Sequence, residues 1–199
     1  TVFLVDADTK GISIGKEEDK MGIRASATAE IIFEECFVPD SARVGKEGRG
    51  FMIAMQTLQM SRPVVAAISV GIAQAAIEAA VAYSHHRKQF GVKIATFEMV
   101  QQMIADMVMK TEAARILTYK ACVAQMNKDK KAGLYSAMSK CFASDTAMEV
   151  TTTAVQVMGG NGYSRENPVE KYMRDAKIMQ IYEGTNQVQR LVIANEATF

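Results

Sequence analysis

Apolar and polar positions follow two different periods along the chain. In residues 1–45 they alternate, and β-branched residues are separated by turn signals, a pattern typical of short strands. The alternation predicts strands over Val2–Val5, Gly11–Ile14 and Ala29–Pro39, the last of which ends at its proline. Three short strands form only part of a sheet and are too few to be stable alone.

From about residue 46 onward the period becomes helical. Apolar residues recur three and four positions apart, which predicts five helices: Phe51–His86, Phe97–Asn127, Leu134–Met158, Val169–Met179 and Thr185–Ala197. Pro63 should kink or split the first of them, and Gly159–Gly162 should end the third. Long helices with short connections predict a mainly α fold, an antiparallel four-helix bundle with extra terminal helices. We therefore divide the chain into a β-region, residues 1–45, and a helical-bundle domain, residues 46–199.

The segment Val64–Tyr83 is apolar almost all round and about as long as a membrane-spanning helix. Gln74 and Glu78 lie in its interior, and alanines are frequent. These features favour a helix buried in the bundle over one that faces lipid. We predict no membrane span.

Composition narrows the classes of function. The chain is 49% hydrophobic with a net charge of +1, which indicates a soluble globular protein without the basic surface that nucleic acid or anionic membrane requires. Cys36, Cys122 and Cys141 lie far apart, and the two histidines are adjacent, so no metal-ligand spacing appears and free thiols are expected. The sequence opens at Thr1 inside apparent β-structure and without a signal peptide, as a fragment of a longer domain would.

Four short motifs each allow a structural and a functional interpretation. "GGNGY" from Gly159 is a helix stop or a phosphate loop, and "HHRKQFG" from His85 is a solvated helix end or an anion site. Thr185 could cap the last helix. Glu183, between an aromatic residue and a glycine, could be a first-turn acid or a catalytic base.

Taken together, the motifs favour the functional interpretations over the structural ones. The segments "MGIRASATAEIIFEECFVP", "GKEGRGFMIAMQTLQMSRPVVAA", "YSHHRKQFG" and "AVQVMGGNGYSRENPVEKYMRDAKIMQIYEGTNQVQRLVIA" follow in this order. In them the chain resembles the acyl-CoA dehydrogenase family over essentially all 199 residues. The resemblance implies that residues 1–45 are the end of that family's middle β-domain and residues 46–199 its C-terminal domain. The family's N-terminal domain and the loops that contact the flavin ring are absent, so we expect this fragment to be inactive alone.

The resemblance also implies an activity. The family is FAD-dependent and oxidises acyl-CoA thioesters to trans-2-enoyl-CoA, and electron-transfer flavoprotein receives the electrons. The catalytic base is the glutamate of a Tyr-Glu-Gly-Thr segment, here Glu183, and such a base must be oriented and desolvated so that its pKa approaches the working pH. In the family the thioester oxygen is polarised by the backbone N–H of the base and by a ribityl hydroxyl of FAD. Tyr182, Gly184 and Arg62 match substrate-side positions, and Gly184 would permit close approach of the backbone.

The implied cofactor contacts fall into two groups. Thr185 and Gln187 match positions that meet FAD beside the catalytic loop. A second group matches positions that meet the adenosine-diphosphate part of a neighbouring subunit's FAD: Arg87, Phe90, Gln156 and Gly160. A homo-oligomer, dimer or homotetramer, is therefore expected. Glu98 departs from the family, which usually has glutamine there, and a carboxylate close to a pyrophosphate would be unfavourable.

Two alternatives remain open at this point. A relative on the same scaffold could run in reverse as an enoyl-CoA reductase, and the chain could be a non-catalytic helical assembly module. The resemblance is nearest to short- and medium-chain enzymes, but the acyl chain length is left open. The resemblance also implies that the protein is located in a bacterial cytoplasm or in a mitochondrial matrix.

Overall fold

The computed structural model describes residues 1–198 and divides the chain into two compact units. The first is Thr1–Leu58, and the second begins at Gln59 and continues to the C-terminal helix. Helix α1 (Gly50–His86) runs through the boundary between the two units. The assignment of residues 1–45 and 46–199 to two family domains stays a prediction.

The first unit holds four short strands in two separate pairs. β1 (Val2–Phe3) pairs antiparallel with β4 (Arg43–Val44), and β2 (Ile12–Glu17) pairs antiparallel with β3 (Ala29–Phe33) across a bulge. Apolar side chains on these strands remain largely exposed, among them Ile14, Ile31 and Phe33. The few short strands that the alternation predicted are present, without a shared core beneath them.

The predicted third strand is too long. β3 ends at Phe33, six residues before Pro39. The reason lies in the next turn, where Glu35 adopts a positive φ of 47° and leaves the extended conformation. The amide of Glu34 still donates to the carbonyl oxygen of Gly11 at 2.8 Å, and pairing stops there.

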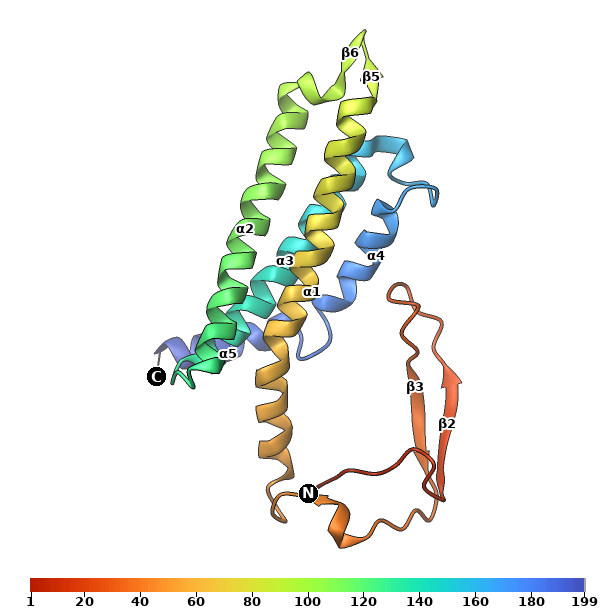
Figure 1. Ribbon diagram of the computed structural model, residues 1–199, viewed down its shortest axis with the longest axis vertical. Helices are drawn as coiled ribbons and strands as arrows, with labels where there is room; N and C mark the ends of the chain where they lie inside the picture. Colours follow the sequence, from red (N-terminus) through yellow and green to blue (C-terminus); the bar gives the residue numbers. More distant parts are fainter. Residues whose placement is uncertain (199) are drawn as a thin grey trace. The chain divides into compact units, whose positions relative to one another are not determined.

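The second unit is an antiparallel helical bundle (Figure 1). Its members are the later part of α1, α2 (Glu98–Met126), α3 (Ala132–Met158) and α4 (Val169–Met179), and α5 (Asn186–Thr198) is the extra terminal helix. Successive helices reverse direction, and α5 lies across the end of the bundle where the chain leaves α4. The predicted fold class is confirmed, and the predicted helix ends agree within two residues.

Pro63 does not split α1. The helix runs unbroken through it, and the ring is buried. A proline in a helix removes one backbone hydrogen bond at a cost of several kcal/mol, and here packing of the surrounding turn outweighs that cost.

Small side chains form the centre of the bundle. Ala76, Ala80, Ala147 and Ala154 are fully buried and meet larger residues such as Met107. Alanine lets helix axes approach closely while it loses no side-chain entropy. A second, smaller cluster joins the same three helices at Ala66, Val70, Ala114 and Ala143.

A tight hairpin joins α1 to α2. β5 (Lys88–Gln89) pairs with β6 (Val92–Lys93), and the two turn residues, Phe90 and Gly91, have positive φ values of 51° and 83°. Two successive left-handed residues characterise the turn that matches strand twist in a hairpin. The phenyl ring of Phe90 is therefore held at the tip of the bundle and is 93% exposed.

Helix α1 is the one described helix whose length and composition would allow a membrane crossing, and its most apolar window has a mean hydropathy of 1.9. Of that window, 44% is buried inside the structure. Helices in a protein core commonly have this length and hydropathy. The buried face of α1 packs on α2 and α3.

Candidate active site

The segment with the candidate base is a tight loop between α4 and α5. The amide of Asn186 donates to the carbonyl oxygen of Gln180 at 3.0 Å and draws the two ends of the loop together. At the turn, Glu183 has a φ of 58° and Gly184 a φ of 89°. A left-handed conformation is unfavourable for a residue with a Cβ atom, so the rest of the structure must hold Glu183 in place.

The Glu183 carboxylate is held by a residue from α1. Ser61 donates from Oγ to Oε2 of Glu183 at 2.5 Å. Arg62, the next residue, is buried, and burial lowers its pKa although Glu183 and Glu196 act to raise it. Its Nε is buried and has no hydrogen-bond partner among the described residues. A half-buried carboxylate thus lies beside a hydroxyl donor and a desolvated cation.

Position 184 needs a glycine because the side chain of Gln189 packs against it. A Cβ atom built on this residue would lie 2.5 Å from Nε2 of Gln189. Gln189 is fully buried and donates from that atom to the carbonyl oxygens of Glu183 at 3.3 Å and Gly184 at 3.1 Å. The glycine therefore allows the loop to close on a supporting amide.

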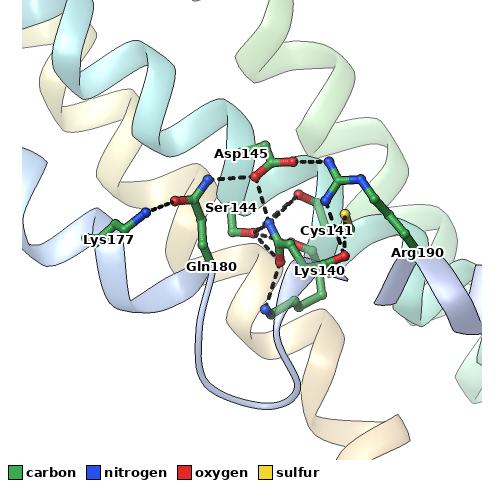
Figure 2. Close-up of polar contacts among 8 residues, drawn as sticks. Lys140, Cys141, Ser144, Asp145, Lys177, Gln180 and Arg190 are labelled. Carbon is green, nitrogen blue, oxygen red and sulfur yellow. Dashed lines mark hydrogen bonds and ion pairs between the residues drawn. The ribbon is translucent and has the colours of Figure 1, made fainter. Parts of the chain in front are cut away.

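A polar cluster beside the loop joins α3, α5 and the end of α4 (Figure 2). Lys140 donates to the carbonyl oxygen of Gly184 and to Oδ1 of Asn186, both at 2.9 Å. Asn186 donates in turn to Oδ1 of Asp145 at 2.7 Å and to Oγ of Ser144 at 2.8 Å. The loop is thus bound from below by side chains that the sequence did not single out.

Asp145 accepts hydrogen bonds from residues at both ends of the loop. Its carboxylate accepts from Gln180 Nε2 at 2.6 Å and from Arg190 Nη2 at 2.6 Å, besides the bond from Asn186. Burial acts to raise the pKa of Asp145, but hydrogen bonds from Arg190, Gln180 and Asn186 outweigh it and hold the pKa below its usual value. The cluster therefore contains an ionised carboxylate at neutral pH.

The other predicted loop residues have structural partners of their own. The Tyr182 hydroxyl lies 2.8 Å from the sulfur of Met179, and burial together with the charge of Glu183 raises the tyrosine pKa. Thr185 Oγ1 accepts from the amide of Val188 at 3.3 Å, as a helix N-cap does. Gln187 is exposed on the first turn of α5. Their predicted contacts with FAD and substrate stay predictions.

The second predicted group lies elsewhere in the bundle. Arg87, Gln156 and Gly160 line one pocket of about 370 Å³ together with Tyr83 and Asn161. A Cβ atom on Gly160 would meet nothing within 4 Å, so space remains above the backbone there. Phe90 contacts Phe97 edge to face, with 6.3 Å between ring centroids, and is not among the residues that line the pocket.

The loop that holds Glu183 and the pocket that contains Arg87 lie beside two distant points of α1. From Ser61, beside the base, to His86, next to Arg87, α1 rises about 37 Å at 1.5 Å per residue. Glu98 is exposed on the first turn of α2, where a negative charge suits the helix dipole, and does not line the pocket.

Within residues 1–198, no group of three or more His, Cys, Asp and Glu side chains is placed to hold a metal ion. The three cysteines are free thiols.

Comparisons with known proteins agree on one family. The description "Acyl-CoA dehydrogenase, C-terminal domain" matches residues 48–198. A probable acyl-CoA dehydrogenase of Mycobacterium tuberculosis, FadE25, is 52% identical over 98% of this chain and 50% of its own length. The mitochondrial short-chain specific acyl-CoA dehydrogenase of Mus musculus is 47% identical over 98% of this chain and 47% of its own.

Solved structures show the same relationship. Butyryl-CoA dehydrogenase from Megasphaera elsdenii matches with a TM-score of 0.97 and 48% identity, over 99% of this chain and 51% of that one. A chain in the structural study of the electron transferring flavoprotein of Acidaminococcus fermentans matches with a TM-score of 0.96 and 53% identity, over 98% and 51%. The chain spans about half the length of the curated relatives it matches.

Proposed function

The chain belongs to the acyl-CoA dehydrogenase family, and from this premise we propose that it is the base-carrying part of an enzyme that desaturates acyl-CoA thioesters at the α,β bond. One observation carries the proposal. Glu183 is held in a strained, half-buried loop with its carboxylate bound by Ser61. Strain of this kind persists where the surrounding structure enforces it, and it is frequent at catalytic positions.

The side chains around Glu183 suit proton abstraction from carbon. The carboxylate takes the proton α to the thioester carbonyl and becomes a carboxylic acid, while negative charge develops on the thioester oxygen. The backbone N–H of Glu183 is the family's donor to that oxygen, and a fixed donor stabilises charge as it develops. Arg62 supplies a desolvated cation near the same carboxylate, and its orphaned Nε supports contact with a polar group of the substrate.

FAD, when bound, supplies the acceptor for the hydride that leaves the β carbon. Two sets of residues in this chain suit the cofactor. Thr185 and Gln187 lie beside the base, whereas Arg87, Gln156 and Gly160 line the distant pocket. A guanidinium fork suits pyrophosphate oxygens, and the open space above Gly160 suits close approach of a ligand. Because the groups are so far apart, the second one serves the FAD of a neighbouring copy, and the protein is a homo-oligomer, a dimer or tetramer.

The relatives' names support the substrate class and the partner. Butyryl-CoA and short-chain acyl-CoA are the substrates that two of them name, so butyryl-CoA is the first substrate to test. Electron-transfer flavoprotein is the proposed electron acceptor, supported by the matching chain in the structural study of that protein. The relatives come from bacteria and from mitochondria, which are the two compartments that we propose.

The geometry favours an enzyme over a helical assembly module. A module without catalysis would need neither a left-handed glutamate nor a glycine that closes on a buried amide. Both features cost stability, and they serve only the shape of the loop between α4 and α5, residues 180–185, which we call the base loop.

The decisive experiment is Glu183→Gln in the full gene product that contains residues 1–199. We expect fold and bound flavin to persist and the rate of flavin reduction by butyryl-CoA to fall by about 10²- to 10⁴-fold, since glutamine keeps the shape and loses the basicity. The control is Glu166→Gln, which removes an exposed carboxylate from the same unit. A rate for Glu183→Gln near that of the control would show that Glu183 is not the base.

A further inference from the structure

Lys140 is an unusual side chain for the middle of a bundle helix. It has no exposed surface and is the largest of the fully buried side chains. It extends from α3 toward the base loop, where its ammonium donates to the carbonyl oxygen of Gly184 and to Asn186 Oδ1 (Figure 2). No motif of the family resemblance drew attention to it.

Burying an ammonium costs free energy, and hydrogen bonds recover only part of this cost. Burial lowers the pKa of Lys140 to about 8, although Cys141, Asp145 and Glu183 act to raise it. An apolar side chain of similar volume would avoid the cost, and such replacements are often neutral for stability. A buried lysine at this place is therefore better explained by the loop that it binds than by the stability of the bundle.

The two acceptors of Lys140 lie just after the candidate base. One is the carbonyl oxygen of Gly184, the residue that follows Glu183, and the other belongs to Asn186, which begins α5. Gln189 also donates from Nε2 to the carbonyl oxygens of Glu183 and Gly184. Hydrogen bonds that fix these peptide groups also fix the direction of the Cα–Cβ bond of Glu183.

We propose that Lys140 is a positioning residue of the base loop: its ammonium anchors the Gly184 carbonyl and so aims the Glu183 carboxylate. This inference rests on the proposed function of Glu183. The ammonium of Lys140 donates to the Gly184 carbonyl oxygen and to Asn186, not to the Glu183 carboxylate. It acts through the loop, with Asn186 and Asp145 as the second layer that ties the loop ends to α3.

The first test needs no activity. In the full gene product, amide hydrogen exchange over residues 180–189 is compared between wild type, Lys140→Met and Val150→Ala. Val150→Ala cuts a buried side chain from the same helix without touching the loop. We expect loop exchange in Lys140→Met to rise by about 10- to 100-fold, the factor that loss of a charge-assisted hydrogen bond implies, and loop exchange in Val150→Ala to change no more than exchange elsewhere in the bundle.

The second test measures catalysis in the full gene product. For Lys140→Met we expect flavin reduction by butyryl-CoA to slow by about 10- to 100-fold with butyryl-CoA affinity within about threefold of wild type, because the ammonium lies beneath the loop. A role in bundle stability alone would leave the rate of flavin reduction by the folded protein unchanged.

Several outcomes overturn the inference. Loop exchange at the wild-type level in Lys140→Met would do so, and so would a mobile loop with an unchanged rate. If Lys140→Met does not fold, Lys140→Gln decides, since any folded variant without the ammonium and with a wild-type loop contradicts the proposal. Because the exchange measurement is independent of turnover, failure of Glu183 as the base and failure of Lys140 as its anchor give different results.

Discussion

Ser61 and Glu183 lie 122 positions apart in the sequence, and their side-chain oxygens lie 2.5 Å apart in the structure. The serine comes from α1, and the glutamate from the loop after α4. This hydrogen bond ties the carboxylate to α1, while Lys140 and Gln189 bind the backbone of the same loop. The base is thus fixed at both its side chain and its main chain.

The first prediction follows from this bond. Ser61→Ala in the full gene product should keep the fold and lower the rate of flavin reduction by butyryl-CoA about tenfold, because a hydrogen bond to a charged group is lost. Stopped-flow bleaching of the flavin measures this rate. Thr152→Ala is the control, since it removes an exposed hydroxyl that bonds only its own helix. Equal rates for the two variants would contradict a positioning role for Ser61.

A second prediction concerns Gly184. Gly184→Ala should destabilise the loop by about 1–3 kcal/mol, since the new Cβ atom would meet Gln189 at 2.5 Å in a residue whose φ is 89°. Gly71→Ala in α1 is the matched control, because nothing lies within 4 Å and a helical alanine is favoured over glycine. Urea unfolding of both variants measures the difference. The idea fails if Gly184→Ala is as stable as Gly71→Ala.

A third prediction concerns stability against pH. The folded pKa of Lys140, about 8, lies below the ordinary value of 10.5. Between these values the unfolded chain binds more protons than the folded one, so the contribution of Lys140 to the free energy of unfolding rises with pH in this window, by at most about 1.4 kcal/mol per pH unit. Denaturant unfolding at pH 7.5 and 9.5 should therefore show a rise in wild type that Lys140→Met lacks.

The control for this slope is Lys110→Met. Its hydrogen bond to Glu149 raises the pKa of Lys110 above the ordinary value. The stability from that pair is present below pH 10.5 and is lost only as the pH rises through the higher folded value. Lys110→Met should keep the wild-type slope between pH 7.5 and 9.5. A wild-type slope in Lys140→Met as well would show that another group titrates in this window.

A fourth prediction addresses the distant pocket. Arg87→Ala should weaken retention of FAD and dissociate the oligomer together, since the guanidinium would hold the neighbour's cofactor at the interface. Lys88→Ala removes the same charge one residue later and outside the pocket lining, so it should leave both unchanged. Flavin absorbance after dilution and gel filtration, with light scattering for mass, gives both readouts. Wild-type flavin content in Arg87→Ala would count against a cofactor role.

A fifth prediction concerns residues 1–199 alone. We expect a helical chain by circular dichroism that self-associates and is colourless after dialysis. Its first unit exposes Ile14 and Phe33 on strands and Phe37 after β3, by 68%, 62% and 82%, and an unpaired strand edge favours association. Hydride transfer depends on positioning that these residues cannot supply alone. A monomer that retained stoichiometric FAD and bleached with butyryl- or octanoyl-CoA would refute this.

By itself the sequence determined the helices and the family. Apolar periodicity is a local property, so it located α2 to α5 within two residues, and the Tyr-Glu-Gly-Thr segment pointed to Glu183. Two local expectations failed: β3 stops early because Glu35 turns left-handed, and α1 continues unbroken through Pro63.

Only the tertiary structure decided what surrounds the base. Lys140 stands between a serine and a cysteine in its helix, and a lone lysine there normally indicates a solvent-exposed face. Its burial and its bond to Gly184 exist only because α5 and the base loop cover it. Likewise Ser61 becomes a partner of Glu183 only when α1 packs beside that loop. Periodicity reports which face of an element is apolar, whereas a polar contact across 44 or 122 residues depends on how the elements pack.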